Sequence, residues 1–407
     1  MYFDEPGLDT LTVRAASKWA RRFAQAGRAY LKVRVATRSD VDGRAATMLP
    51  HMPRFGYEAL MVSALVVGTA LGYFRGGKVH VEMFYDDGVA DGEDPYRPVL
   101  SGNPRPQVRR VQAPRNLGDL AADIDDLYWS KAYGQVVKVT RVGEGESRRW
   151  VVSLPGTDHM GLESTPNPAD TETNIREVLN LPSAIRVGLV QVLHDAMKSD
   201  GISRDQWHNE RVFLCGHSQG GMVAASLASI PPEEARINIV ALLTTGAPSR
   251  RWKIRDDVTM ISIAHDQDVI PAIDGTSEHV SDHRISVGRR LTRPRSGPLY
   301  YAHSSSTYTE TVRLMERQAK VAPWGRVAGA VVTMEGFFPQ EGEATRVFFY
   351  DVWQELLEPV KTNAWDTFAM LERPDWETME QESERDAGVR HVRHNTVRAT
   401  KGVDDEA

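Results

Sequence analysis

The chain has 407 residues, of which 41% are hydrophobic and 26% are charged, and its formal net charge is −6. This length suits one large domain with additions or two domains, and the composition is typical of a globular protein. The acidic balance gives no electrostatic basis for binding nucleic acid. The single cysteine, Cys215, excludes a disulfide within the chain and lies in an apolar run, which favours a buried residue over a nucleophile.

The N-terminal region, residues 1–134, is expected to be mostly helical and to form a cap over the core, with an independent helical module as the alternative. Residues 9–34 have an aromatic face and a basic face, so that helix either packs on the core or lies on an anionic membrane. The apolar run 59–74 is shorter than the ~20 residues of a spanning helix and predicts a buried or interfacial helix. The absence of a secretory signal pattern predicts a cytoplasmic location.

From residue 135 onward, strand-like and helix-like runs alternate, which indicates a mostly parallel sheet with helices on both faces. We expect this α/β core to span 135–372 and a mobile charged tail to span 373–407. The expected strands are 78–85, 135–142, 150–154, 211–215, 237–245, 258–264, 327–337 and 344–350. The expected helices are 117–132, 184–198, 219–229 and 351–371, and 86–112 is expected to be a loop.

The strongest motif of the chain follows the apolar run 212–215, where Gly216-His217-Ser218-Gln219-Gly220 fits the pattern Gly-x-Ser-x-Gly. The run predicts a buried strand, and the small and apolar residues after the motif predict a helix. A serine on such a turn has a strained backbone, and the flanking glycines remove side chains that would clash. The first N–H groups of the helix would stabilise negative charge beside Ser218. We therefore expect Ser218 to be a nucleophile rather than an incidental serine in a glycine-rich turn.

A nucleophilic serine needs a base that takes its proton and an acid that orients the base. In enzymes with this kind of turn, the acid and then the base follow the serine along the chain. The expected strand 258–264 ends at the same edge of the sheet as Ser218, and Asp266 and Asp268 come directly after it. We expect Asp268 to be the acid and keep Asp266 as the alternative, while a solvated loop in which both are structural is the simpler interpretation.

Four histidines are candidates for the base. His303 follows Asp268 by the length of a loop and lies in a polar turn flanked by tyrosines. His279 and His283 also follow Asp268, and His265 precedes it at the end of the expected strand. Chain order favours His303, although a surface histidine is usually only solvated.

An oxyanion site needs two hydrogen-bond donors directed at the tetrahedral intermediate. The backbone N–H of Gln219, directly after Ser218, supplies one of them in this kind of turn. The expected strand 150–154 is followed by Pro155-Gly156-Thr157, so Thr157 is the candidate for the second donor, through its backbone and its hydroxyl. A simple Pro-Gly turn is the alternative interpretation.

These segments together resemble the α/β-hydrolase superfamily and, within it, the class 3 lipase-like group. The end of the expected strand at Gly156-Thr157 is similar to that family's oxyanion strand, and residues 216–221 are similar to its Gly-His-Ser-Leu-Gly-Gly. Residues 244–248 resemble its strand ending in Gly-x-Pro, and residues 266–271 resemble its Asp-x-Val-Pro motif. His303 and Tyr308 have the spacing of its His-x-x-x-x-Tyr ending. The resemblance covers roughly residues 135–310.

The resemblance implies an α/β-hydrolase fold and a serine hydrolase that cleaves a carboxylic ester, with Ser218, Asp268 and His303 as its triad. It implies no metal and no cofactor, a small-molecule or lipid ester as substrate and, with the N-terminal helix, peripheral membrane contact. His391 and His394 form a His-x-x-His pair without further ligands, which is weak evidence for a metal site.

The sequence departs from the family at three places. Pro155 stands where the family has arginine, Gln219 stands where it has leucine, and 158–173, where a lid would lie, lacks the family's tryptophan–aspartate pattern. The substrate type is therefore the open part of the prediction. The alternatives are a thioesterase or acyltransferase of the same fold and a catalytically inert hydrolase-fold binding module.

Overall fold

The structure is a computed structural model of the chain. It describes residues 111–274, 281–291 and 298–357, together with 71–89, 93–97 and a few positions between 61 and 69. The predictions for 9–34 and for the tail 373–407, and the candidates His279, His391 and His394, lie outside the described residues.

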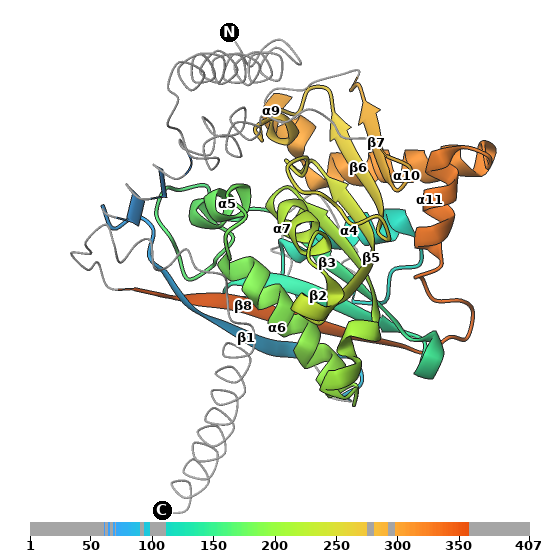
Figure 1. Ribbon diagram of the computed structural model, residues 1–407, viewed down its shortest axis with the longest axis horizontal. Helices are drawn as coiled ribbons and strands as arrows, with labels where there is room; N and C mark the ends of the chain where they lie inside the picture. Colours follow the sequence, from blue (N-terminus) through green and yellow to red (C-terminus); the bar gives the residue numbers. More distant parts are fainter. Residues whose placement is uncertain are drawn as a thin grey trace, which may run out of the picture.

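Eight strands of the described residues form one mixed sheet in the order β1-β8-β2-β3-β4-β5-β6-β7 (Figure 1). The antiparallel part consists of β1 (Gly76–Asp86), β8 (Thr345–Leu356), β2 (Gln135–Val142) and β3 (Arg149–Leu154). The parallel part continues from β3 through β4 (Arg211–His217), β5 (Asn238–Thr245), β6 (Thr259–His265) and β7 (Arg284–Arg289). Because β3 to β7 run in the same direction, their carboxyl ends meet at one edge of the sheet.

Helices cover both faces of this sheet (Figure 1). One face carries α5 (Thr171–Val178), α6 (Ala184–Ser199) and α7 (Gln219–Ala228). The other carries α4 (Leu117–Leu127), α10 (Ser305–Val321) and α11 (Arg326–Glu335). Alternate residues of β4 contribute to the hydrophobic cores on the two faces of the sheet. Val212 and Leu214 face the first group of helices, and Phe213 and Cys215 face the second. The predicted α/β sheet with helices on both faces is confirmed.

Two elements of the N-terminal region belong to this core. β1 pairs with β8 over its whole length, and α4 packs between the sheet and α10. Leu117, Leu120 and Ile124 of α4 are fully buried on one helical face. The boundary that we expected at residue 134 is therefore wrong for β1 and α4, which complete the sheet and one of its covering layers.

Most of the predicted strands and helices between residues 135 and 265 are confirmed within a few residues, but two later predictions are wrong. The expected strand 327–337 is the helix α11, whose buried residues Ala328, Val331 and Met334 recur at helical spacing. The expected helix at 351–371 begins as the last part of β8, where Val352 and Gln354 are buried in alternation with more exposed neighbours. Residues after 357 are not described.

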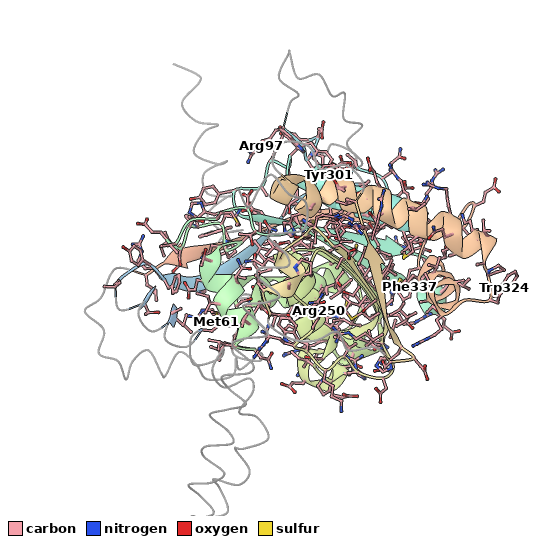
Figure 2. The ribbon with its side chains drawn as sticks, turned by 90° about the horizontal axis from the view of Figure 1, so that it is seen from above. Met61, Arg97, Arg250, Tyr301, Trp324 and Phe337 are labelled. Atoms are coloured by element: carbon pink, nitrogen blue, oxygen red, sulfur yellow. The ribbon has the colours of Figure 1, made fainter. Side chains whose placement is uncertain are left out.

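The elements that were not predicted include β7, α5, α10 and the short helix α9 (Pro298–His303). His303 is the last residue of α9, so the polar turn expected around it is a break between two helices. The turn between α10 and α11 carries Trp324, which is 87% exposed at the edge of the view in Figure 2. Hence the chain after β6 is much more helical than the sequence indicated.

Within the apolar run 59–74, the described positions between 61 and 69 are helical, whereas residues 71–74 lie outside the helix. Leu65 of the helical part and Phe74 of the following segment are buried. In the described part of the chain, no helix combines the length and the apolar character that crossing a membrane requires.

Candidate active site

Ser218 occupies the sharp turn between β4 and α7. Its φ of 53° and ψ of −120° lie in a region that a residue with a side chain rarely adopts. Its N–H donates to the carbonyl of Thr245 on β5 at 2.9 Å, and its carbonyl accepts from the N–H of Met222 at 3.2 Å. The sheet and the first turn of α7 therefore hold the strained backbone in place.

The glycines on either side of Ser218 allow this close approach. A Cβ at Gly216 would collide with the backbone of Gly220, and a Cβ at Gly220 would collide with the carbonyls of Leu154 and Pro155. Without side chains at these positions, α7 can begin directly against the end of β3. This is the steric function that we expected from the motif.

The three residues expected to form the triad lie in one chain of hydrogen bonds. His303 Nε2 is 2.9 Å from Ser218 Oγ, and His303 Nδ1 is 2.8 Å from Asp268 Oδ2. The side chain of Asp268 is completely buried, whereas 22% of the His303 side chain is exposed. The imidazole therefore lies between a buried carboxylate and a serine at the edge of the sheet.

Asp268 is held by donors on both of its oxygens. The hydroxyl of Tyr308 donates to Oδ2 at 2.6 Å, and the N–H of Ile270 donates to Oδ1 at 3.0 Å. Burial and the neighbouring carboxylate raise the pKa of Tyr308 well above its usual value, so its hydroxyl stays protonated and acts as a donor. Asp266 is exposed on the same loop. The geometry thus brings Asp268, and not Asp266, to the histidine.

His265 lies beside this arrangement without reaching Ser218. It is fully buried, its ring stacks on that of Tyr308 at 3.9 Å, and its nitrogens lie 2.7 Å from the Ala302 carbonyl and 2.8 Å from Thr311 Oγ1. Burial lowers its pKa, which favours a neutral ring. His283 precedes β7 at the opposite edge of the sheet, where its ring bonds to Ser281. Of the histidines in the described residues, His303 is therefore the one hydrogen-bonded to Ser218.

His217, the residue before the serine, packs against His303. Their ring centroids are 4.8 Å apart, and His217 Nδ1 is 3.3 Å from Thr245 Oγ1. Burial, and secondarily the charge of His303, lower the pKa of His217 well below its usual value. A neutral ring therefore supports His303 from the side of the strand.

The turn after β3 lies directly against Ser218. Leu154 and Gly216 are partners in the parallel ladder, and a Cβ at Gly156 would come within 2.7 Å of Ser218 Cβ. The side-chain amide of Gln135, at the start of β2, donates to the carbonyls of Pro155 at 3.1 Å and of Gly156 at 3.2 Å. These two hydrogen bonds hold the turn in place. Of the expected oxyanion residues, Gln219 follows Ser218 directly, and Thr157 belongs to the turn that packs against Ser218 at Gly156.

A third element, α5, links these two residues. The side chain of Asn174 donates to Thr157 Oγ1 at 3.2 Å and accepts from Gln219 Nε2 at 3.0 Å. Sequence reasoning missed Asn174 because it missed the helix. Asp170, whose side chain accepts from the N–H of Thr173, is a typical N-cap and was the signal that could have revealed it.

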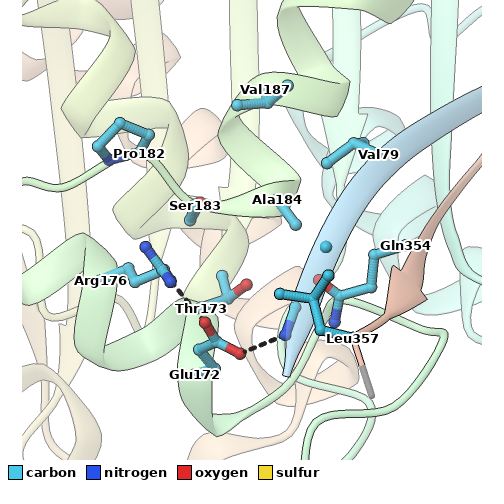
Figure 3. Close-up of a pocket in the computed structure, with 12 residues that line it drawn as sticks. Val79, Glu172, Thr173, Arg176, Pro182, Ser183, Ala184, Val187, Gln354 and Leu357 are labelled. Atoms are coloured by element: carbon cyan, nitrogen blue, oxygen red, sulfur yellow. Dashed lines mark hydrogen bonds and ion pairs between the residues drawn. The ribbon is translucent and has the colours of Figure 1, made fainter. Parts of the chain in front are cut away.

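A cavity of about 340 Å³ lies between β1, α5 and the start of α6 (Figure 3). Its lining includes Glu172, which accepts hydrogen bonds from the backbone of Gly76 at 2.9 Å and from Arg176 at 2.7 Å. None of Ser218, Asp268 and His303 lines it. The cavity is therefore a feature separate from the serine site.

Cys215 is buried below the turn, and burial raises the pKa of its thiol far above the usual value, so it is no nucleophile. Within the described residues, no group of three His, Cys, Asp or Glu side chains is placed to hold a metal ion. Comparisons of the chain with protein-family models, with curated proteins and with solved structures give no match. Functional assignment therefore depends on the geometry around Ser218.

Proposed function

We propose that the protein is a serine hydrolase of the α/β-hydrolase type that cleaves a carboxylic ester through an acyl-enzyme. The observation that carries the proposal is the unbroken hydrogen-bond chain from a strained Ser218 through His303 to a buried Asp268. A nucleophile, a base and an orienting acid within hydrogen-bond reach are the geometric signature of nucleophilic acyl transfer. The mixed sheet with helices on both faces is compatible with this fold.

The order of the proton transfers follows from the two hydrogen bonds of His303. Ser218 Oγ attacks the ester carbonyl while His303 Nε2 takes its proton, and Asp268 stabilises the resulting imidazolium through Nδ1–H. The C–O bond to the alcohol then breaks, and His303 returns the proton to the leaving oxygen. Water attacks the acyl-enzyme with the same base, which releases the carboxylic acid and restores Ser218.

The negative charge of the tetrahedral intermediates would be stabilised by two donors. The N–H of Gln219 belongs to the first turn of α7, where helix geometry leaves N–H groups without intrahelical partners. Thr157 provides the second from the turn that packs against Ser218. Donors fixed before the reaction cost no reorganisation when the charge develops.

An apolar acyl group is favoured by the side chains near Thr157. Met160 and Leu162, on the loop between Thr157 and α5, are 79% and 66% exposed. Exposed apolar side chains on the loop that follows Thr157 favour a substrate with an alkyl or aryl acyl group over a highly charged one.

The test is covalent labelling with a fluorophosphonate, measured by intact mass. Wild type is expected to gain one adduct, the Ser218→Ala variant none, and Ser147→Ala, which changes an exposed serine at the other edge of the sheet, one. Hydrolysis of p-nitrophenyl esters of increasing acyl length would be lost in Ser218→Ala alone. If folded wild-type protein neither labels nor hydrolyses these esters, the proposal fails and an inert binding module becomes the better interpretation.

A further inference from the structure

Three side-chain amide and hydroxyl groups form a relay above the candidate oxyanion site. Gln219 Nε2 donates to the backbone carbonyl of Asp170 at 2.8 Å and to Asn174 Oδ1 at 3.0 Å. Asn174 Nδ2 then donates to Thr157 Oγ1 at 3.2 Å. The relay thus connects the residue after the nucleophile with the residue at the end of the β3 turn, through α5.

The direction of every hydrogen bond in this relay is fixed by its first member. The carbonyl of Asp170 can only accept, so Gln219 must present its nitrogen to it, and its second N–H points at Asn174. Asn174 must therefore present its oxygen to Gln219 and its nitrogen to Thr157. Gln219 and Asp170 are almost completely buried, which leaves little water to replace these bonds.

The relay determines what the Thr157 hydroxyl can do. A hydroxyl has one proton and two lone pairs, and here one lone pair accepts from Asn174. The proton therefore remains available for a different acceptor. The turn that carries Thr157 packs against Ser218 at Gly156, which makes the oxyanion formed at Ser218 the candidate acceptor.

We propose that Asn174 is a positioning residue that keeps the Thr157 hydroxyl a donor to the oxyanion. This inference rests on the proposed hydrolase function. It also gives Gln219, the departure from the family's leucine, a function for its side chain. Part of α5 serves the oxyanion site through Asp170 and Asn174, while Glu172 and Arg176 face the cavity of Figure 3.

The variant that tests the proposal is Asn174→Asp, which keeps the shape but replaces the donor to Thr157 by an acceptor. The Thr157 proton would then turn toward the new carboxylate and away from the oxyanion. We expect kcat for a p-nitrophenyl ester to fall about 10–100-fold with KM changed less than about threefold, since the loss is confined to the transition state. Asn209→Asp, the same chemical change at an exposed position before β4, is the control and should retain kcat.

A double-mutant cycle separates this role from a merely structural one. Thr157→Val removes the hydroxyl and should lower kcat about 10²-fold, whereas Thr157→Ser keeps a hydroxyl at this position and provides the second background of the cycle. If Asn174 acts through the Thr157 proton, Asn174→Asp should lower kcat only slightly in the Thr157→Val background. In the Thr157→Ser background it should lower kcat by its full factor. Equal losses in both backgrounds would overturn the inference, as would an unchanged kcat in the single variant.

Two further outcomes are distinguishable. Should Asn174→Asp not fold, Asn174→Ala replaces it in the same cycle, with an expected loss of about tenfold that Thr157→Val again removes. If wild type shows no hydrolysis that depends on Ser218, the proposed function and this inference fall together. If Ser218-dependent hydrolysis is present but insensitive to residue 174, the inference alone is overturned.

Discussion

The two ends of the parallel strands are held by different kinds of polar group. At the carboxyl ends, the groups around the triad are largely neutral: a protonated Tyr308, and the rings of His217 and His265, whose pKa values burial lowers. They act as fixed dipoles and hydrogen-bonding groups. A site built in this way can accept a charge that develops during a reaction without an opposing charge already in place.

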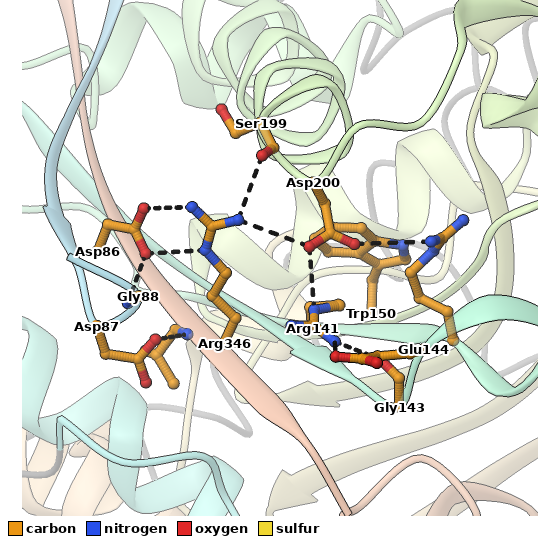
Figure 4. A network of polar contacts seen from close by, with 12 residues as sticks. Asp86, Asp87, Gly88, Arg141, Gly143, Glu144, Trp150, Ser199, Asp200 and Arg346 are labelled. Atoms are coloured by element: carbon orange, nitrogen blue, oxygen red, sulfur yellow. Dashed lines mark hydrogen bonds and ion pairs between the residues drawn. The ribbon is translucent and has the colours of Figure 1, made fainter.

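At the amino ends, charged side chains pair with one another instead (Figure 4). Arg346 of β8 bonds both oxygens of Asp86 at 3.0 and 2.7 Å and approaches Asp200, which also pairs with Arg141 at 3.1 Å. These contacts join β1, β8, β2 and the end of α6. Ion pairs therefore stabilise this edge of the sheet, and no step of the proposed reaction uses them.

One acidic residue near each end of the strands has a pKa that is shifted in the opposite direction from the other: Asp170 and Glu343. Burial raises the pKa of Asp170, at the start of α5, to about 7. The hydrogen bonds of Arg149 hold the pKa of Glu343, beside the amino ends of the strands, at about 2. Desolvation therefore has the larger effect at Asp170, and pairing with Arg149 has the larger effect at Glu343.

The largest effect is expected at the carboxylate of the triad. Replacing Asp268 by Asn removes the acceptor that fixes the His303 tautomer and should lower kcat by about 10³–10⁴-fold. Asp266→Asn, two residues earlier and exposed, should retain kcat within about twofold. Steady-state ester hydrolysis compares the two, and equal losses would show that neither carboxylate acts on His303 specifically.

A smaller loss is expected when Asp268 loses one of its donors. Tyr308→Phe removes a buried hydroxyl that lies 2.6 Å from Asp268, and should lower kcat about tenfold and the free energy of unfolding by about 1–2 kcal/mol. Tyr350→Phe removes a comparable buried hydroxyl, 3.0 Å from Asp195, and should affect stability alone. Measuring kcat and urea unfolding for both separates the two functions, and an unchanged kcat in Tyr308→Phe would contradict the orienting role.

The sequence predicted the parts of the site that are local in the chain. The glycines around Ser218, the strand before it and the helix after it lie within one short stretch, so pattern alone locates the turn. Asp268 and Asp266 follow the same strand, and only burial and the bond to His303 separate them. Those two facts depend on α9 and α10, which pack later parts of the chain onto the loop.

The parts that the sequence did not predict depend on long-range contacts. Val331, Val332 and Thr333 are β-branched and indicated a strand, but the α11 face at Ala328 and Met334 is buried against the sheet layer as a helix. Asn174 carries no signal of its own, because its function depends on meeting Gln219 and Thr157 from a separate helix. In α11, packing against the sheet overrode the strand propensity of the β-branched residues. For Asn174, propensity gave no indication of a function.

The pH dependence of the free energy of unfolding tests whether the pKa of Asp170 is raised in the folded protein. Because its pKa is raised in the folded protein, its contribution to stability is present at low pH and is lost as pH rises from about 4 toward 7. The free energy of unfolding of wild type, minus that of Asp170→Asn, should fall by about 2–4 kcal/mol over this window. The subtraction cancels the contribution of buried His194, whose pKa is lowered to about 4. That contribution makes the free energy of unfolding rise with pH, opposite to the effect of Asp170. A difference that is flat or rises with pH would contradict burial as the main cause of the raised pKa.

Glu343, at the opposite edge of the sheet, should show the reverse pH dependence of stability. Its effect is the smallest that we expect. Glu343 accepts two hydrogen bonds from Arg149, so its contribution is present above its unfolded pKa and is lost as pH falls toward 2. Glu343→Gln should lower the free energy of unfolding by about 1–2 kcal/mol near neutral pH, by much less near pH 3, and leave kcat unchanged. Glu341→Gln, at an exposed position two residues away, is the matched control. Because the pair is remote from Ser218, a loss of kcat in Glu343→Gln would mean that the two ends of the sheet are coupled, and the separation of reaction and stability between them would have to be abandoned.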